Sequence, residues 1–287
     1  MEAISPRERE MAFYESVVGE YLRYGSVDEV FKRHNWDLPI SYPGFHKLLD
    51  SWGVVKSVGP NNSMGEAIAF LEMLSREKIP LERLYKSLPP SFQTSIATMY
   101  RILDCVKRGV ARRYATCLVV TPFDDPDQIL VAQDVSTPRF EFGKFYGALT
   151  LPMTFSKKNE SYERSITRVL QQEVFSLDVV KKNFSYEKVH QGVELFCRFS
   201  LIDLSVSVYS VKLSREYSDL SGFSSFKLKD FNFMTSKNIL EQKHLFRAGV
   251  AEVVSVYKDI LEDVVEEFSY PINAISQLNQ DLALAFF

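Results

Sequence analysis

The residues best suited to metal chemistry lie between positions 151 and 175. Glu160 begins a stretch with helical spacing, and Gln172 and Glu173 lie near the end of that stretch. Hydrolysis of a diphosphate with Mg²⁺ requires several hard oxygen ligands that converge on the cation. Gln172 offers only a neutral amide oxygen, so Glu173 supplies the only charged oxygens at this end of the helix. The sequence therefore predicts a lost or very weak metal site.

This segment, LPMTFSKKNESYERSITRVLQQEVF, resembles the box of the Nudix family. The family motif is G-x5-E-x7-R-E-U-x-E-E-x-G-U, where U is a bulky aliphatic residue; its glycines shape a loop and its helical glutamates hold divalent metal against a diphosphate. The positions that match are Glu160, Arg168, Leu170 and Glu173. The departures are Thr154 and Phe175 for glycines, Val169 and Gln172 for glutamates, and Ser176 for the aliphatic residue. We therefore expect residual box positions at Glu160, Arg168 and Glu173 but no complete catalytic set.

The resemblance covers about residues 114–265 and implies a Nudix-like α/β/α sandwich with a mixed sheet. It implies Mg²⁺ as a cofactor only where hydrolase activity survives; otherwise we expect no cofactor and no bound metal. Glu160 and Arg168 are eight residues apart in the sequence. That spacing is about two helical turns, so we expect no direct pair between them. Arg168 is expected to pair instead with Glu173 or with a loop carbonyl.

Residues 41–56, SYPGFHKLLDSWGVVK, have the pattern of a helix that lies in the major groove of DNA. The apolar residues that would form its buried face are Phe45, Leu48, Leu49 and Trp52. The segment resembles the second helix of helix-turn-helix families, which often ends in a similar WG(V/I) sequence. A helix in the groove needs polar or basic groups on its exposed face. The expected DNA contacts are Tyr42, His46, Lys47 and Lys56.

A second group of polar and basic residues lies in positions 91–113. Short hydrogen-bonding side chains near the start of a long helix suit phosphates or base edges, and a basic cluster follows at its end. The expected DNA contacts here are Thr94, Arg101, Lys107, Arg108, Arg112 and Arg113. The alternative for the basic cluster is charge that complements the helix dipole. The helices expected at 26–35 and 41–53 also have an alternative. Their connection, residues 35–40, is longer than the turn of a usual helix-turn-helix motif. The alternative for them is a helical bundle that binds protein.

Capping boxes and helix breakers divide the first part of the chain into two units of three helices each, residues 1–60 and residues 61–113. The expected helices are 7–24, 26–35 and 41–53 in the first unit, and 63–78, 81–88 and about 91–108 in the second. The two units in tandem indicate an all-helical N-terminal region.

From Ala115 the hydrophobic period changes from helical to strand-like. The turn cluster Asp124–Asp127 is typical of a hairpin between the first two strands. The expected strands are 116–121, 128–133, 186–190, 192–200, 206–213 and 225–228, and the expected helices are 160–175, 236–265 with an internal break, and 272–285. Strands and helices therefore intermix in residues 114–287, and the predicted fold class is α+β and multi-domain.

The composition is that of a globular protein. The chain has 287 residues, of which 46% are hydrophobic and 25% are charged, and its cysteines lack the spacing of a zinc site. We find neither an apolar run of about 20 residues nor the apolar core of a signal peptide, so we expect a cytoplasmic protein without a membrane partner. The net charge of −3 divides into +2 over residues 1–114 and −5 over residues 115–287, which favours the first part as the partner of an anion.

These features predict a DNA-binding regulatory protein whose Nudix-like domain is a non-catalytic ligand sensor or dimerisation platform. The architecture resembles Nudix-related transcriptional regulators with the domain order reversed. The expected walls for a nucleotide-like ligand are Phe142, Phe145 and Tyr146. The apolar face of residues 250–261 is expected either to form a homodimer or to dock on the chain's own core. The alternative functions are a Mg²⁺-dependent nucleoside-diphosphate hydrolase and a protein- or RNA-binding scaffold.

Overall fold

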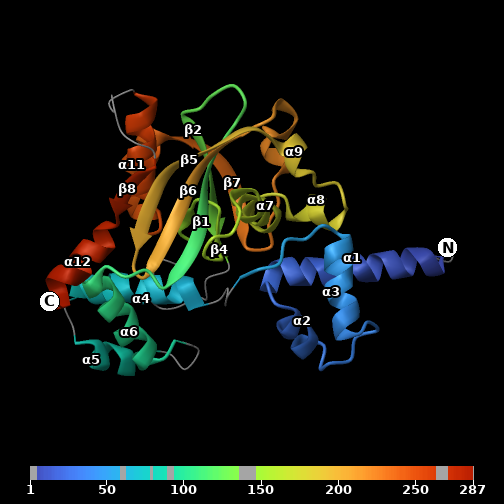
Figure 1. Ribbon diagram of the computed structural model, residues 1–287, viewed down its shortest axis with the longest axis horizontal. Coiled ribbons are helices and arrows are strands. Elements are labelled where there is room, and N and C mark those ends of the chain that lie inside the picture. The colour runs from blue at the N-terminus through green and yellow to red at the C-terminus, as the bar shows by residue number, and fades with distance from the viewer. Residues whose placement is uncertain are drawn as a thin grey trace.

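The computed structural model describes residues 5–58, 63–77, 80–88, 94–135, 147–262 and 271–286 (Figure 1). A helical N-terminal region is followed by an α/β domain with a mixed sheet, which confirms the fold class predicted from the sequence. In the part of the chain that is described, no helix is both long enough and apolar enough to cross a lipid bilayer.

The N-terminal region begins with α1 (Pro6–Tyr24), α2 (Val27–Arg33) and α3 (Tyr42–Ser51). Each helix follows a serine whose hydroxyl accepts a hydrogen bond from a backbone N–H of the first turn; these serines are Ser5, Ser26 and Ser41. The apolar faces meet in one buried cluster, which includes Val18, Leu22, Val30, Phe45 and Leu49. The helices expected in residues 7–53 are confirmed, with ends that differ by at most two positions.

The next helices are α4 (Ser63–Glu77), α5 (Leu81–Lys86) and α6 (Ile96–Arg108). Their buried residues include Leu74 and Met99, which belong to the same apolar cluster as Cys117 and Val208 of the sheet. The helices of residues 61–113 therefore pack as part of the α/β domain. The division expected at residue 113 separates two types of secondary structure, but a continuous hydrophobic core crosses it.

Two sheets form the centre of the α/β domain. The larger sheet has the strand order β4 (Met153–Ser156), β1 (Arg113–Thr121), β6 (Leu204–Leu213), β5 (His190–Leu201), β8 (Ile272–Ile275). It is mixed, because β1 pairs with β6 and β5 pairs with β8 in parallel, whereas the other neighbours are antiparallel. The smaller sheet is antiparallel and has the order β3 (Leu149–Thr150), β2 (Gln128–Asp134), β7 (Leu228–Thr235).

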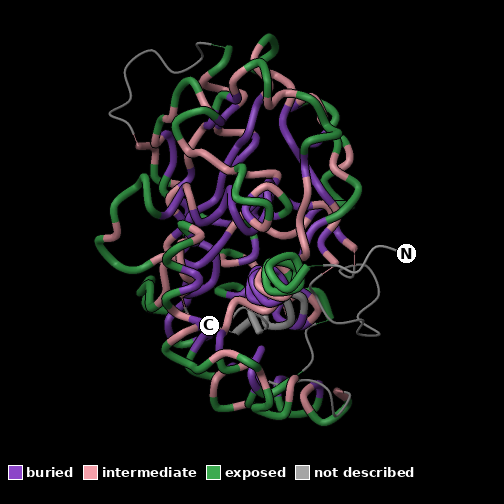
Figure 2. The backbone as a smooth tube through the Cα atoms, turned by 90° about the vertical axis from the view of Figure 1, so that its right-hand side faces the viewer, coloured by how far each residue is buried: buried purple, intermediate pink, exposed green. Residues whose placement is uncertain are grey.

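Helices cover both faces of the larger sheet (Figure 1). The helices of this domain include α7 (Tyr162–Glu173), α8 (Ser176–Val180), α9 (Tyr186–Val189), α10 (Ser236–Glu241), α11 (Val250–Leu261) and α12 (Gln277–Phe286). Successive side chains of a strand point to opposite faces of the sheet. Val119 of β1 therefore lies in the apolar cluster that includes α11, and Leu118 lies in the cluster that includes Ile166 of α7. Figure 2 shows the buried parts of the chain in the interior and the exposed parts around them.

The apolar face of α11 is covered by the chain itself. Val250, Val253, Val254 and Tyr257 are buried in the cluster that α11 shares with the larger sheet. Of the two expectations for this face, docking on the chain's own core is therefore the one that the structure has. A homodimer would require another surface.

Some expected elements of the α/β domain are wrong. The turn at 124–127 does not close a hairpin, because β1 and β2 belong to different sheets. Both strands are buried at most positions, and a run that is covered on both faces does not reveal its pairing partner. Residues 186–189 form the short helix α9, β7 begins at Leu228 rather than at 225, and 272–275 form a strand before the last helix. Short apolar runs such as these fit either period.

Candidate functional site

Arg168 lies on α7 and is only 1% exposed. Its guanidinium donates to both carboxylate oxygens of Glu160, to the carbonyl of Phe155 at 3.0 Å and to the carbonyl of Lys56 at 2.9 Å. A buried guanidinium is stable only when its charge is paired and its N–H groups find acceptors. Arg168 therefore acts as a clamp between α7, the loop before it and the segment that follows α3.

The Glu160–Arg168 pair corrects the expectation that the two residues lie too far apart. Glu160 is not on the helix, since α7 begins at Tyr162. The backbone turns at Asn159, where φ is 62°, and Lys157 N donates to the Glu160 carboxylate at 3.2 Å. Burial opposes ionisation of Glu160, but the hydrogen bonds from Arg168 and Lys157 prevail and lower its pKa. The expected contact of Arg168 with a loop carbonyl is confirmed, whereas its pairing with Glu173 is not.

Residues 53–57, here named the linker, lie against the polar side of α7. Gln171 binds it twice, because its Nε2 donates to the Gly53 carbonyl at 2.8 Å and its Oε1 accepts from Val55 N at 2.8 Å. Gln172 Nε2 donates to Ser57 Oγ at 2.9 Å. Together with the contact from Arg168, these hydrogen bonds use the polar groups of three box-region residues to hold the linker, through backbone atoms of residues 53, 55 and 56 and through the Ser57 hydroxyl.

Lys227 places an ammonium group beside the remaining carboxylate of the box. Its Nζ lies 3.1 Å from Gln172 Oε1 and 3.7 Å from Glu173 Oε1. The side chains of Lys227 and Glu173 are 8% and 9% exposed. Burial raises the pKa of Glu173 to about 7, although Lys227 acts in the opposite direction. The oxygens that a metal ion would need are thus already turned to a cation of the protein.

A second buried pair, Asp134 with Arg247, lies close to Glu173. Arg247 Nη1 donates to Asp134 Oδ2, and the side chains are 15% and 4% exposed for Arg247 and Asp134. Asp134 raises and Arg247 lowers the pKa of Glu173, which shows that the four groups interact. This buried charge cluster of Glu173, Lys227, Asp134 and Arg247 balances two acids with two bases, and such balance is what permits charges to be buried.

These contacts do not fit the Mg²⁺ site that the Nudix box implies. Val169 is fully buried in the apolar cluster between α7 and the larger sheet. The amide of Gln172 is used by Ser57 and Lys227, and Glu173 faces an ammonium group. Among the described residues there is no group of three or more His, Cys, Asp or Glu side chains that could hold a metal ion. Hard oxygen ligands therefore do not converge here.

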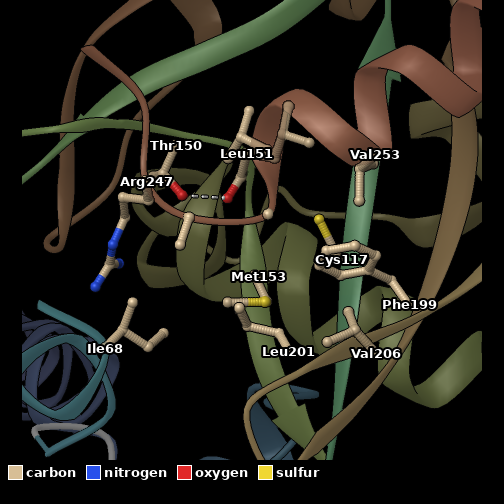
Figure 3. A pocket seen from close by; sticks show the side chains of 13 residues that line it. Ile68, Cys117, Thr150, Leu151, Met153, Phe199, Leu201, Val206, Arg247 and Val253 are labelled. Carbon is tan, nitrogen blue, oxygen red and sulfur yellow. Dashed lines mark hydrogen bonds between the residues drawn. The ribbon is translucent and has the colours of Figure 1, made fainter. Parts of the chain in front are cut away.

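A small apolar cavity lies between the larger sheet and the start of α11 (Figure 3). Cys117, Phe199 and Val206 line it, and Figure 3 shows the guanidinium of Arg247 directed away from these side chains. Its volume is about 30 Å³, which is room for one or two water molecules. Ligand pockets are on the order of 300–1,000 Å³. The cavity is therefore a packing defect of the core and does not admit a nucleotide.

The DNA-contact candidates of α3 lie at different angles around that helix. Tyr42 is 37% exposed, its ring centroid lies 5.1 Å from that of His46, and Lys47 is exposed. Lys56 lies beyond the helix end, and its Nζ is 2.9 Å from Asp50 Oδ1. Tyr42 and His46 are thus neighbours one turn apart, and Lys47 is exposed farther round the helix. The charge of Lys56 is partly neutralised.

The second group of DNA-contact candidates is divided by the structure. Thr94 is only 6% exposed and precedes α6, whose cap is Ser95, so its expected surface contact is wrong. Arg108 pairs with Asp104, and Arg113 pairs with the buried Asp203. Arg113 therefore holds the start of β1 in place. The candidates with exposed side chains are Arg101, Lys107, Arg108 and Arg112.

The aromatic candidates for ligand binding, Phe142, Phe145 and Tyr146, lie outside the described residues. Three residues that complete the buried charge cluster around Glu173 were not predicted from the sequence: Lys227, Asp134 and Arg247. Their positions are spread over more than a hundred residues, and no local spacing connects them. Gln171 was also missed, although a glutamine next to the box glutamates was visible in the sequence.

No protein-family model matches this chain. No curated protein matches it either.

Solved structures of the Nudix family are similar to part of the chain. A Nudix hydrolase from Nitrosomonas europaea is 16% identical, with 57% of this chain and 78% of that chain covered and a TM-score of 0.38. The MutT protein from Methanosarcina mazei Go1 is 11% identical, with 54% and 97% covered and a TM-score of 0.37. The Nudix domain of Shewanella oneidensis NrtR, solved in complex with ADP ribose, is 14% identical, with 64% and 99% covered and a TM-score of 0.34. Likeness at this level leaves activity and ligand open.

Proposed function

We propose that this protein is a regulator that binds DNA through α3 and whose Nudix-like domain senses a ligand without catalysing hydrolysis. The observation that carries the proposal is the linker contact. Arg168, Gln171 and Gln172 of α7 bind the linker, which directly follows α3 in the chain. The helix that would hold metal and diphosphate in a hydrolase is used here to join the two parts of the protein.

The ammonium of Lys227 supports the non-catalytic part of the proposal. A fixed positive charge between Gln172 and Glu173 competes for the oxygens that Mg²⁺ would need, and it repels a second cation. Glu173 is also buried, so a metal ion would have to displace Lys227 and desolvate the carboxylate further. Both effects disfavour a catalytic metal at this position.

Contacts between the end of α3 and α8 support a route from the α/β domain to the DNA-binding helix. Trp52 Nε1 donates to the Val180 carbonyl of α8 at 3.1 Å, and Lys182 Nζ lies 3.5 Å from the centroid of the Trp52 ring. Val179 of α8 is part of the buried cluster of α1–α3. Since α8 directly follows α7, a shift of α7 on ligand binding would reach α3 through packed side chains.

The exposed side of α3 supports the DNA-binding part. Phe45 and Leu49 are buried and fix the angle of the helix, while Tyr42 and Lys47 face solvent. A helix with one side held by its domain and a polar, basic side open to solvent is the arrangement by which helix-turn-helix proteins enter the major groove.

DNA selection from a random pool with the purified chain tests the DNA-binding part. We expect enrichment of a sequence that the wild type binds more tightly than unrelated DNA, and loss of that preference in Lys47→Ala. Lys237→Ala is the control, because Lys237 is a 74% exposed lysine on α10, away from α3. Binding without sequence preference, or none, would contradict the proposal and favour the scaffold alternative.

A hydrolysis assay with Mg²⁺ on a panel of nucleoside diphosphates that includes ADP-ribose tests the non-catalytic part. We expect no turnover above background for the wild type or for Glu173→Gln. Mg²⁺-dependent turnover in the wild type that Glu173→Gln removes would establish the hydrolase alternative instead.

A further inference from the structure

One end of the larger sheet is polar on the face that carries α7. α7 packs on Leu118 and Val120 of β1, which are buried. Tyr114 and Thr116 lie on the same face of β1, nearer the start of the strand, and line a groove of about 380 Å³. The apolar cavity beside Cys117 lies on the opposite face of the sheet. The groove is therefore a separate space from that cavity.

The floor of this groove consists of hydroxyl groups in register across the strands. One row runs from Ser156 of β4 through Tyr114 to Ser205 of β6. The next row places Thr116 beside Ser207 and ends at Arg198 of β5. A sheet face that a helix covers is apolar, so these hydroxyls are not required for packing. A hydroxyl both donates and accepts hydrogen bonds, which suits sugar hydroxyls and phosphate oxygens alike.

The charged side chains at the groove that lack an ion pair in the described part of the chain are all basic. Lys157 and Lys158 lie in the turn before α7, and Arg198 lies on β5. Glu160 is the one carboxylate among the lining residues, and its charge is already paired with Arg168 and Arg164. None of the three cations forms an ion pair with a carboxylate in the described part of the chain. Their positive potential is thus available to an anion.

The turn that carries the lysines is held in place by the box clamp. Glu160 accepts a hydrogen bond from Lys157 N, and Glu160 N donates to the Lys157 carbonyl at 3.2 Å. Asn159 between them has a left-handed φ of 62°. Since Arg168 fixes Glu160, the clamp also holds the backbone of the turn from which both lysines project.

We propose that this groove binds a small phosphorylated sugar, with the phosphate near Lys157, Lys158 and Arg198 and the sugar over the serine and tyrosine hydroxyls. Charge-assisted hydrogen bonds from lysine and arginine recognise phosphate, and the hydroxyl rows recognise a ring that carries hydroxyls. The volume lies in the range of small-molecule sites. The inference rests on the ligand-sensing part of the proposed function, and it is independent of DNA binding by α3.

Isothermal titration calorimetry with the full chain tests the proposal. The probes are ribose 5-phosphate and AMP, with ribose and inorganic phosphate as the two halves of the ligand. We expect saturable binding of at least one phosphorylated probe, and binding at least about tenfold weaker for each half, because charge-assisted and neutral hydrogen bonds both contribute. Tighter binding of AMP would identify a nucleotide as the ligand, and tighter binding of ribose 5-phosphate a sugar phosphate.

Variants locate the binding in the groove. Lys157→Gln with Lys158→Gln is expected to weaken ribose 5-phosphate about tenfold or more, whereas Lys229→Gln with Lys237→Gln, which changes exposed lysines elsewhere, has no effect. Ser207→Ala removes one hydroxyl and no charge, so it should weaken ribose 5-phosphate without changing the binding of inorganic phosphate.

Three results would overturn the proposal. They are the absence of saturable binding for all probes, equal affinity for inorganic phosphate and ribose 5-phosphate, and unchanged affinity in the Lys157 and Lys158 variant. The second result would mean an anion patch only. A chain that binds ribose 5-phosphate in this groove but no DNA contradicts DNA binding by α3 and supports the groove.

Discussion

The helices α7 and α3 use their polar sides in opposite ways. On α7, Arg168, Gln171 and Gln172 are at most 2% exposed, and their polar groups bind the chain itself. On α3, Tyr42 is 37% exposed and Lys47 faces solvent. Both helices are amphipathic in sequence. The amphipathic pattern alone therefore does not separate a helix that holds the fold together from one that is free to meet a partner.

The difference comes from what folding brings to each helix. The linker reaches α7 from more than a hundred positions earlier in the chain and covers its polar side. In the described part of the chain, the side chain of Lys47 makes neither a hydrogen bond nor an ion pair. An open polar side in the folded chain is thus a stronger indication of a binding surface than the residue types of a motif.

The clamp on α7 should be the most sensitive point of the fold. Arg168→Met is expected to lower the free energy of unfolding by about 3–5 kcal/mol, because Glu160 is left as a buried charge without its partner. The loss of donors to the Phe155 and Lys56 carbonyls acts in the same direction. Urea unfolding followed by circular dichroism measures the change.

Arg164→Met is the matched control for the clamp. Arg164 Nε lies 3.5 Å from the same Glu160 carboxylate, but its side chain is 61% exposed. An exposed ion pair contributes about 1 kcal/mol or less, so this variant should remain close to the wild type. Losses of similar size in the two variants would contradict the assignment of Arg168 as the clamp.

Glu173 should make stability depend on pH. Its pKa in the folded chain is about 7, raised by burial from 4.5, so between these values the folded state binds more protons than the unfolded state. The free energy of unfolding therefore falls as pH rises from about 4.5 to about 7 and is level above that range. The size of this decrease is up to about 3 kcal/mol, and urea unfolding at a series of pH values measures it.

Glu173→Gln removes this titration and should make the profile shallower over the same pH range. The slope that remains belongs to Glu72, whose pKa burial also raises to about 7. Glu163→Gln is the control, since Glu163 is an exposed carboxylate on the same helix and should leave the slope unchanged. If wild type and Glu173→Gln have the same slope, Glu173 does not carry the pH dependence.

Gln171 should determine how firmly the linker is held. Gln171→Leu keeps the size of the side chain but leaves the Gly53 carbonyl and Val55 N without their partner, at a cost of about 2 kcal/mol. Limited proteolysis should then cut the linker faster than in the wild type. Gln280→Leu changes an exposed glutamine on α12 and is the control. Unchanged cleavage would show that other contacts suffice to hold the linker.

The sequence predicted the elements whose signals are local. The capping serines of α1, α2 and α3 bind N–H groups three residues away, so their pattern can be read directly from the chain. The clamp could not be predicted, because the Lys56 carbonyl is 112 positions from Arg168. Glu160 was placed on the helix only because the helix was expected to begin two residues early, and that small error removed the ion pair.

The sequence predicted which metal ligands the site lacks, but it did not predict which charged groups the site contains. Val169 and Gln172 showed that the metal ligands are incomplete, yet nothing near Lys227 showed that its ammonium would lie between Gln172 and Glu173. The hydroxyl rows, by contrast, were visible: Ser205 and Ser207 alternate with valines in a strand-like run, and such alternation places them on one face. Which face stays uncovered depends on how far α7 extends, and the sequence does not give that.

The smallest expected change in stability belongs to Lys47, on the open side of α3. Lys47→Ala should alter the free energy of unfolding by no more than about 0.5 kcal/mol, because the side chain is exposed and makes no contact to lose. If its ammonium neutralises a DNA phosphate, the slope of log affinity against log salt should decrease by about 0.9. Fluorescence anisotropy with the selected DNA at several salt concentrations measures that slope.

Lys56→Ala sharpens the same measurement. The Lys56 ammonium lies 2.9 Å from Asp50 Oδ1, so part of its charge is already neutralised. A contact between Lys56 and a DNA phosphate would therefore release fewer counterions than a contact from an unpaired lysine. Removal of Lys56 should change the salt slope less than the removal of Lys47, although both lysines are close in the sequence. An unchanged slope together with unchanged affinity in Lys47→Ala would exclude Lys47 from the DNA interface and contradict its expected contact.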